Sequence, residues 1–246
     1  MIEQTYGWTE RYAPTALAAV LAADRGRWDR LIAHSQDRVC SLVEDDVPTI
    51  VVHPHMGSMF LPQPFLVAHG ARIVSFVRGG DQVQRLQPIL ERVSGIPMST
   101  RMEWIEVPNL LALRSAEKAL ASRRLFFWQV DSVANVAQRE AGRHMVATRM
   151  LGFGVHAPTG LYEVAHRTGA RVVLTYDLLL SGARPRFRLA LEPVDADLGS
   201  AEAWFGDIYR AVDAALYQHV RQWKQLVGWL KHGGSAVAAD GDEVAV

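Results

Sequence analysis

The 246-residue chain has little cysteine, no excess of charge and no long hydrophobic run. Its single cysteine, Cys40, excludes an intramolecular disulfide and a cysteine-rich zinc module. Its 26 basic and 26 acidic residues balance, which argues against a protein that binds nucleic acid through phosphates. The longest apolar runs, such as Leu125–Trp128, fall far short of the ~20 residues of a membrane span. We therefore expect a cytoplasmic protein without a signal peptide, and peripheral contact with the inner membrane stays open.

The composition is that of a folded protein, with 49% apolar and 21% charged residues. No repeat and no low-complexity linker divides the chain, so we expect one domain over residues 1–232. The remainder, 233–246, is rich in glycine, alanine and aspartate and lacks periodicity, which predicts a disordered tail.

Short β-branched or apolar runs alternate with segments of helical periodicity. The predicted strands are Val47–His53, Arg72–Val77, Glu103–Val107, Leu125–Asp131, Arg171–Leu179 and Arg186–Glu192. The predicted helices lie within Pro14–Val43 and at Phe60–His69, Gln82–Ser94, Leu110–Ser122, Pro158–Thr168 and Ala201–Lys231, and Val133–Ala147 is predicted as a loop. This order predicts an α/β fold with a mixed, mostly parallel central sheet flanked by helices, and a long amphipathic helix at the C-terminal end.

In such folds ligands bind beyond the carboxyl ends of the strands. The segment His53-Pro-His-Met-Gly-Ser58 follows a buried strand in a Gly/Pro turn, and histidine is the side chain best suited to move protons near neutral pH. His55 is the better candidate for a general base. Both histidines have a plainer interpretation as turn residues that bind backbone groups.

Two further interpretations stay open. A metal-dependent hydrolase would use His53 and His55 with additional ligands, but no other histidine or aspartate stands at a compact ligand spacing. Asp131, which closes an apolar strand, either orients a histidine or caps the next turn. Arg78 ends another strand and either holds an anionic group such as a phosphate or is exposed, and Arg149 is a weaker candidate for the same role.

Five segments in this order resemble the bacterial lipid A late acyltransferases, a branch of the lysophospholipid acyltransferase superfamily. They are HPHMGSM, Arg78, LFFWQVD, MLGFGVHAPTGLYEVAHRTGARVV and QHVRQWKQLVGWLKH, and the resemblance spans about Val47 to Lys231. It implies a glycerolipid acyltransferase-like fold and transfer of an acyl group from an acyl carrier protein or coenzyme A, with no bound cofactor.

The resemblance assigns roles to individual residues. His55 takes the place of the family's general base and Gly57 that of a glycine, while Arg78 and Asp131 match residues that follow two strands. The acidic residue expected after the histidine falls on Phe60.

Backbone N–H groups of Gly57 and Ser58 are then expected to stabilise the oxyanion, and Arg78 to contact a phosphate of the pantetheine arm or of coenzyme A. Phe60 either lines an acyl pocket or belongs to the core. His53 and Arg149 complete the expected substrate-binding set.

Three outcomes fit the missing acidic residue. Asp131 or Glu140 replaces it in space, the acceptor is an amine that needs less help from a base, or the protein is a non-catalytic relative that binds acyl thioesters or a carrier protein. The sequence lacks the N-terminal anchoring helix common in those enzymes, so we expect a small soluble amine or alcohol as acceptor.

The tryptophans Trp204, Trp223 and Trp229 either pack in the core or contact lipid or a partner.

Overall fold

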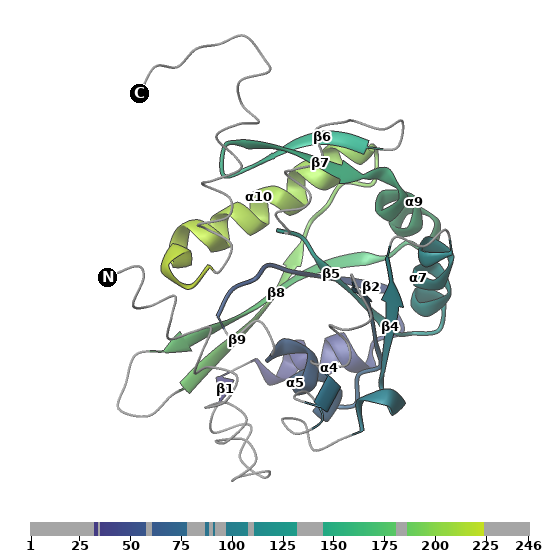
Figure 1. The fold of residues 1–246 in the computed structure, drawn as a ribbon, viewed down its shortest axis with the longest axis vertical. Coiled ribbons are helices and arrows are strands. Elements are labelled where there is room, and N and C mark those ends of the chain that lie inside the picture. Colours follow the sequence, from purple (N-terminus) through teal and green to yellow (C-terminus); the bar gives the residue numbers. More distant parts are fainter. Residues whose placement is uncertain are drawn as a thin grey trace.

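The computed structural model describes residues 32–33, 35–57, 61–77, 87–88, 91, 97–107, 111–131, 145–180 and 186–223 (Figure 1). The strands in these ranges are β1 (Ile32–Ala33), β2 (Thr49–His53), β3 (Ile73–Val77), β4 (Met102–Glu106), β5 (Leu125–Gln129), β6 (Met145–Met150), β7 (Phe153–Pro158), β8 (Arg171–Leu180) and β9 (Arg186–Val194). The helices are α4 (Gln36–Glu44), α5 (Pro62–Ala68), α7 (Ala112–Ala121), α9 (Thr159–Thr168) and α10 (Ala201–His219), with short 3-10 turns η1 (Met98–Thr100) and η2 (Val220–Gln222).

Seven of these strands form one sheet in the order β1-β9-β8-β2-β5-β3-β4. The pairs β8–β2, β2–β5, β5–β3 and β3–β4 are parallel, as is β1–β9, whereas β9 is antiparallel to β8. The predicted α/β class with a mixed, mostly parallel sheet is therefore confirmed. The apolar runs of β2 and β5 are buried on both faces, as expected for central parallel strands.

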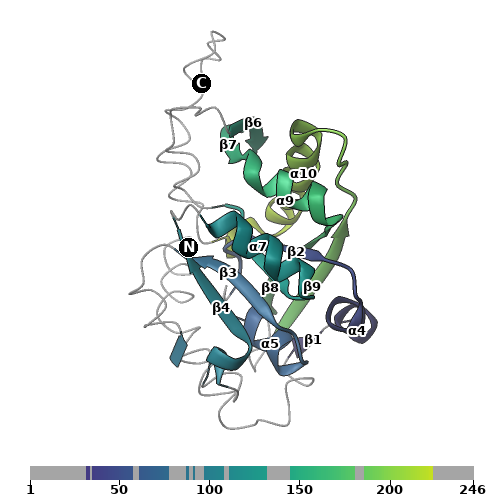
Figure 2. The same cartoon turned by 90° about the vertical axis from the view of Figure 1, so that its right-hand side faces the viewer.

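Helices cover both faces of the sheet, and a separate apolar core lies between the sheet and the helices on each face (Figures 1 and 2). Helices α7, α9 and α10 pack on one face, where Ile50 and Val52 of β2 point. Helices α4 and α5 pack on the other face, against Val51 of the same strand. Successive side chains of a strand alternate between faces, so β2 supplies both cores.

The hairpin β6–β7 was not predicted, and the predicted loop Val133–Ala147 is wrong at its end, where β6 begins at Met145. The two strands pair from Met145 with Pro158 to Met150 with Phe153, and Leu151 and Gly152 form the connecting turn. Both turn residues have positive φ, 51° and 81°, as a tight two-residue hairpin requires. The turn lacks the usual Asn-Gly pair, so the sequence pattern does not predict a hairpin here.

The C-terminal helix is shorter than predicted. Helix α10 ends at His219, η2 follows, and Trp223 is extended with φ −84° and ψ 114°. A continuous helix through Trp223 is therefore wrong, and the predicted helical residues 224–231 lie outside the described residues. Ile32–Ala33 is likewise a strand where a helix was predicted.

Several expectations lie wholly or largely outside the described residues: the helices before residue 31 and at 82–94, the tail 233–246, and Trp229. Among the helices that are described, none is both long enough and apolar enough to cross a membrane.

Candidate active site at the ends of strands β2 and β5

The register of two parallel strands brings His55 and Asp131 together. Strand β2 pairs with β5 from Thr49 with Leu125 to His53 with Gln129. His55 and Asp131 each lie two residues beyond this last pair, so they emerge side by side at the carboxyl end of the sheet. This is the edge at which α/β proteins gather their functional side chains.

The two side chains form a short, buried hydrogen bond. His55 Nδ1 lies 2.6 Å from Asp131 Oδ1, and the His55 backbone N–H donates to both carboxylate oxygens at 3.0 and 2.9 Å. Asp131 is fully buried, whereas the His55 side chain is 11% exposed. The carboxylate is thus enclosed by protein, and the imidazole alone reaches toward solvent.

Asp131 stays ionised despite its burial. Burial alone would raise the pKa of this carboxyl. The adjacent His55 charge and the hydrogen bonds from the His55 ring, the Trp223 indole and the His55 amide together hold the pKa of Asp131 below its ordinary value. An ionised carboxylate only accepts hydrogen bonds, so Nδ1 of His55 carries its proton. In the neutral ring the lone pair is then on Nε2, the nitrogen that takes up a proton.

The turn that contains His55 packs closely against β8. The Met56 N–H donates to the carbonyl oxygen of Pro54 at 2.7 Å, which closes a tight turn around His55. Gly57 follows with φ +57°, and a Cβ there would overlap the carbonyl oxygen of Asp177 and lie 2.7 Å from its Oδ2. Only glycine fits this conformation and this contact.

Gly57 has a different role from the one expected. Its backbone N–H donates to the carbonyl oxygen of Gln222 at 3.0 Å. The expected use of this N–H for an oxyanion therefore does not match the structure. Instead it fastens the turn after β2 to the segment after α10.

That segment contributes a site residue that the sequence interpretation missed. The indole Nε1 of Trp223 donates to Asp131 Oδ2 at 2.6 Å, and Trp223 is only 2% exposed. Met56 and Trp223 also form an isolated antiparallel bridge. The helical periodicity of Ala201–Lys231 continued through Trp223 and hid its role, and no local signal marks it.

His53 is buried for a structural purpose. Its Nδ1 lies 3.0 Å from the carbonyl oxygen of Thr175, just beyond the last β2–β8 pair of Val52 with Leu174. A carbonyl oxygen only accepts, so Nδ1 donates. The ring also packs edge-on against Phe127, with centroids 6.5 Å apart. His53 thus extends the β2–β8 ladder, and the expectation that it binds substrate finds no support in these contacts.

The remaining predicted site residues are not brought to His55. Arg149 lies exposed in β6, in register with Gly154. Ser58, Phe60, Arg78 and Glu140 lie outside the described residues. Within the described ranges, no group of three or more His, Cys, Asp or Glu side chains is placed to hold a metal ion.

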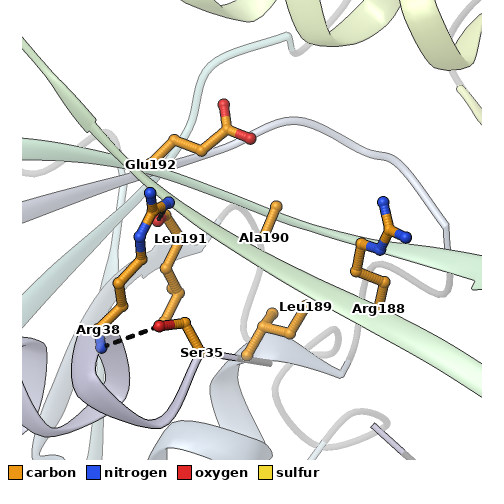
Figure 3. A pocket seen from close by; sticks show the side chains of 7 residues that line it. All are labelled: Ser35, Arg38, Arg188, Leu189, Ala190, Leu191 and Glu192. Atoms are coloured by element: carbon orange, nitrogen blue, oxygen red, sulfur yellow. Dashed lines mark hydrogen bonds between the residues drawn. The ribbon is translucent and has the colours of Figure 1, made fainter. Parts of the chain in front are cut away.

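A pocket of about 320 Å³ lies elsewhere, where the start of α4 meets β9 (Figure 3). It is lined by Ser35, Arg38, Arg188, Leu189, Ala190, Leu191 and Glu192. The Arg38 guanidinium already donates to the carbonyl oxygen of Leu191 at 2.6 Å. Neither His55 nor Asp131, nor any other predicted site residue, lines this pocket.

Comparison with known proteins does not place the chain in a family. No protein-family model matches it, and no curated protein matches it. Any assignment of function therefore rests on the residues and their geometry.

Proposed function

We propose that the protein is an acyltransferase, with His55 as general base and Asp131 as the residue that orients it. It would move an acyl group from an acyl-carrier-protein or coenzyme A thioester to an amine or hydroxyl of a small acceptor. The observation that carries the proposal is the buried 2.6 Å contact between His55 Nδ1 and Asp131 Oδ1 at the carboxyl end of the sheet.

The pair supports a complete transfer step. Nε2 of His55 takes the proton of the acceptor as its oxygen or nitrogen attacks the thioester carbonyl carbon. The tetrahedral intermediate collapses, the carbon–sulfur bond breaks, and the leaving thiolate receives that proton from Nε2. Asp131 remains ionised and stabilises the transient imidazolium. The products are an ester or amide and a free thiol.

Asp131 also supplies the carboxylate that the sequence motif lacks. The resemblance to the lipid A late acyltransferases puts an acidic residue at position 60, where this chain has Phe60. Asp131 instead reaches His55 from the neighbouring strand β5. This replacement favours an active enzyme over a non-catalytic relative, because a relative that only binds would have no need of a buried, ionised carboxylate against the histidine.

The test is thiol release from a panel of acyl-coenzyme A and acyl-carrier-protein donors. The wild type is compared with His55→Ala, and His166→Ala is the matched control because His166 lies exposed on α9. We expect the wild type and His166→Ala to release thiol from at least one donor. His55→Ala should be slower by roughly 10²–10⁴-fold, the usual contribution of a positioned general base.

Two results would contradict the proposal. Release that persists in a folded His55→Ala variant would place the chemistry elsewhere. No release by the folded wild type from any donor would favour the non-catalytic relative, and the same donors would then be titrated as ligands.

A further inference from the structure

Trp223 joins the site from the far end of the chain, 92 positions after Asp131. Its indole N–H donates to Oδ2, the carboxylate oxygen opposite the one that faces the His55 ring. The carboxylate therefore has a strong donor on each oxygen, with the His55 amide spanning both. None of the charged or polar residues that the sequence singled out supplies this contact.

The indole contact has a definite mechanical consequence. The last torsion of an aspartate is broad, because its carboxylate rotates about the Cβ–Cγ bond with little resistance. Without the indole, Oδ2 would keep only the His55 amide, which it shares with Oδ1, and the rotation would be softer. Ring donors on both oxygens fix the plane of the carboxylate, and the plane decides where Nδ1 of His55 is held.

Trp223 is itself held firmly in place. The Gln222 side chain bonds the backbone of Leu179 twice, with Oε1 accepting at 2.8 Å and Nε2 donating at 3.0 Å. The Gln222 carbonyl oxygen accepts from the Gly57 N–H, and Trp223 bridges Met56. Residues 222–223 thus tie the turn after β2 to the end of β8, with the indole directed at Asp131.

We propose that Trp223 is a positioning residue, which fixes the Asp131 carboxylate and through it the orientation and tautomer of His55. The inference deepens the proposed function and rests on it for any effect on catalysis. The geometric part, a carboxylate and imidazole that depend on the indole N–H, stands on the contacts alone.

The chain provides a matched control in Trp204. This tryptophan lies in α10, is fully buried, and stacks on Trp128 with ring centroids 6.5 Å apart. Its Nε1 has no hydrogen-bond partner among the described residues. Trp204→Phe and Trp223→Phe therefore remove the same group from equally buried places, and only the second removes a bond to Asp131.

The first readout does not depend on activity. In ¹⁵N-histidine NMR of the full chain, a short N–H···carboxylate bond gives a strongly downfield proton, assigned to His55 by its loss in His55→Gln. We expect this resonance to shift or broaden in Trp223→Phe and to stay unchanged in Trp204→Phe. An unchanged resonance in Trp223→Phe would overturn the proposal.

The second readout is the pH profile of thioester cleavage. Losing one hydrogen bond to a charged group should lower kcat by roughly tenfold in Trp223→Phe and leave KM within about twofold. The acid limb should move to higher pH, because a carboxylate with one donor fewer holds the His55 proton more tightly. An equal loss at every pH, matched by Trp204→Phe, would show that the tryptophan only packs.

A second substitution tests the proposal if Trp223→Phe does not fold. If Trp223→Phe does not fold, a benzothienylalanine at position 223 keeps the bicyclic shape and lacks the N–H, and the same two outcomes apply to it. If the wild type cleaves no donor, the proposed function fails, but the NMR comparison still decides whether Trp223 positions the pair.

Discussion

His53 and His55 stand two residues apart at the end of β2, and the structure treats them differently. His53 is inside the strand, 1% exposed, and its Nδ1 donates to the carbonyl oxygen of Thr175. His55 is beyond the strand in a tight turn, and its Nδ1 donates to the Asp131 carboxylate. A carbonyl partner holds a ring in place, whereas a carboxylate also stabilises the charge that the ring gains when it takes a proton.

The difference follows from position. Within the strand a side chain must point to one face of the sheet, and His53 points to the face shared with Phe127. Past the strand the backbone can turn back, and Gly57 lets it approach β8 closely enough to hold His55 over the neighbouring strand end. The two histidines are two residues apart, yet His53 has a structural hydrogen bond inside the sheet and His55 has a carboxylate partner suited to proton transfer.

The largest expected effect comes from converting the carboxylate of Asp131 to an amide. In Asp131→Asn the amide group must present N–H to either His55 or Trp223, so a donor faces a donor in both orientations, and the neutral amide no longer stabilises the imidazolium. We expect thioester cleavage to fall by roughly 10²–10⁴-fold, measured as kcat on the best donor.

The counterpart is His53→Ala, which removes the donor to Thr175 and should cost about 1–3 kcal/mol of unfolding free energy. Cleavage by this variant should stay within about threefold of the wild type. If His53→Ala lost as much activity as Asp131→Asn while still folded, the division between the two histidines would be wrong.

A second prediction concerns Gly57, which lets the turn after β2 approach β8 and hold His55 beside Asp131. Gly57→Ala would place a Cβ against the backbone of Asp177 at φ +57°, so we expect roughly 2–4 kcal/mol of destabilisation in denaturant unfolding. Gly152→Ala is the matched control, because its φ is +81° and no heavy atom lies within 4 Å of the added Cβ. That variant should lose only about 1 kcal/mol. Equal losses in the two variants would mean that the contact with Asp177 yields easily.

The main strands could be predicted from local patterns. Strands β2, β3, β5 and β8 are dense in β-branched or aromatic residues, and glycine or proline marks several of their ends. The same patterns placed His55 and Asp131 at strand ends. Their contact could not be derived locally, because it depends on β5 lying beside β2, although β3 and β4 come between them in the chain.

Trp223 illustrates what a local pattern cannot contain. Its spacing from Val220 and Val212 fits the apolar face of a helix, so periodicity alone extends α10 through it. In the structure the helix ends earlier, since the bonds from Gln222 to Leu179 and Gly57 and from Trp223 to Asp131 favour an extended backbone. Such competition between local preference and distant partners is visible only in three dimensions.

The smallest expected effect contrasts Asp131 with a second carboxylate, Asp213 of α10. Partial burial raises the pKa of Asp213 from 3.8 to about 6. The hydrogen bond that Asp213 accepts from the Leu151 N–H at 2.9 Å lowers the pKa, but by less than burial raises it. The folded state therefore binds the proton more tightly than the unfolded chain. The resulting stabilisation is complete below pH 3.8 and is lost as the pH rises through about 6.

Asp213→Asn keeps an acceptor for Leu151 and never ionises. It should be more stable than the wild type at pH 8, by on the order of 1 kcal/mol for a partly exposed group, and the gap should close between pH 6 and 4. Thermal unfolding at pH 8, 6 and 4 measures this. Asp131→Asn should behave in the opposite way, with a stability deficit at pH 8 that shrinks only below pH 4, because the pKa of Asp131 is lowered in the fold. Parallel pH dependences in the two variants would show that the donors on Asp131 do not keep it ionised.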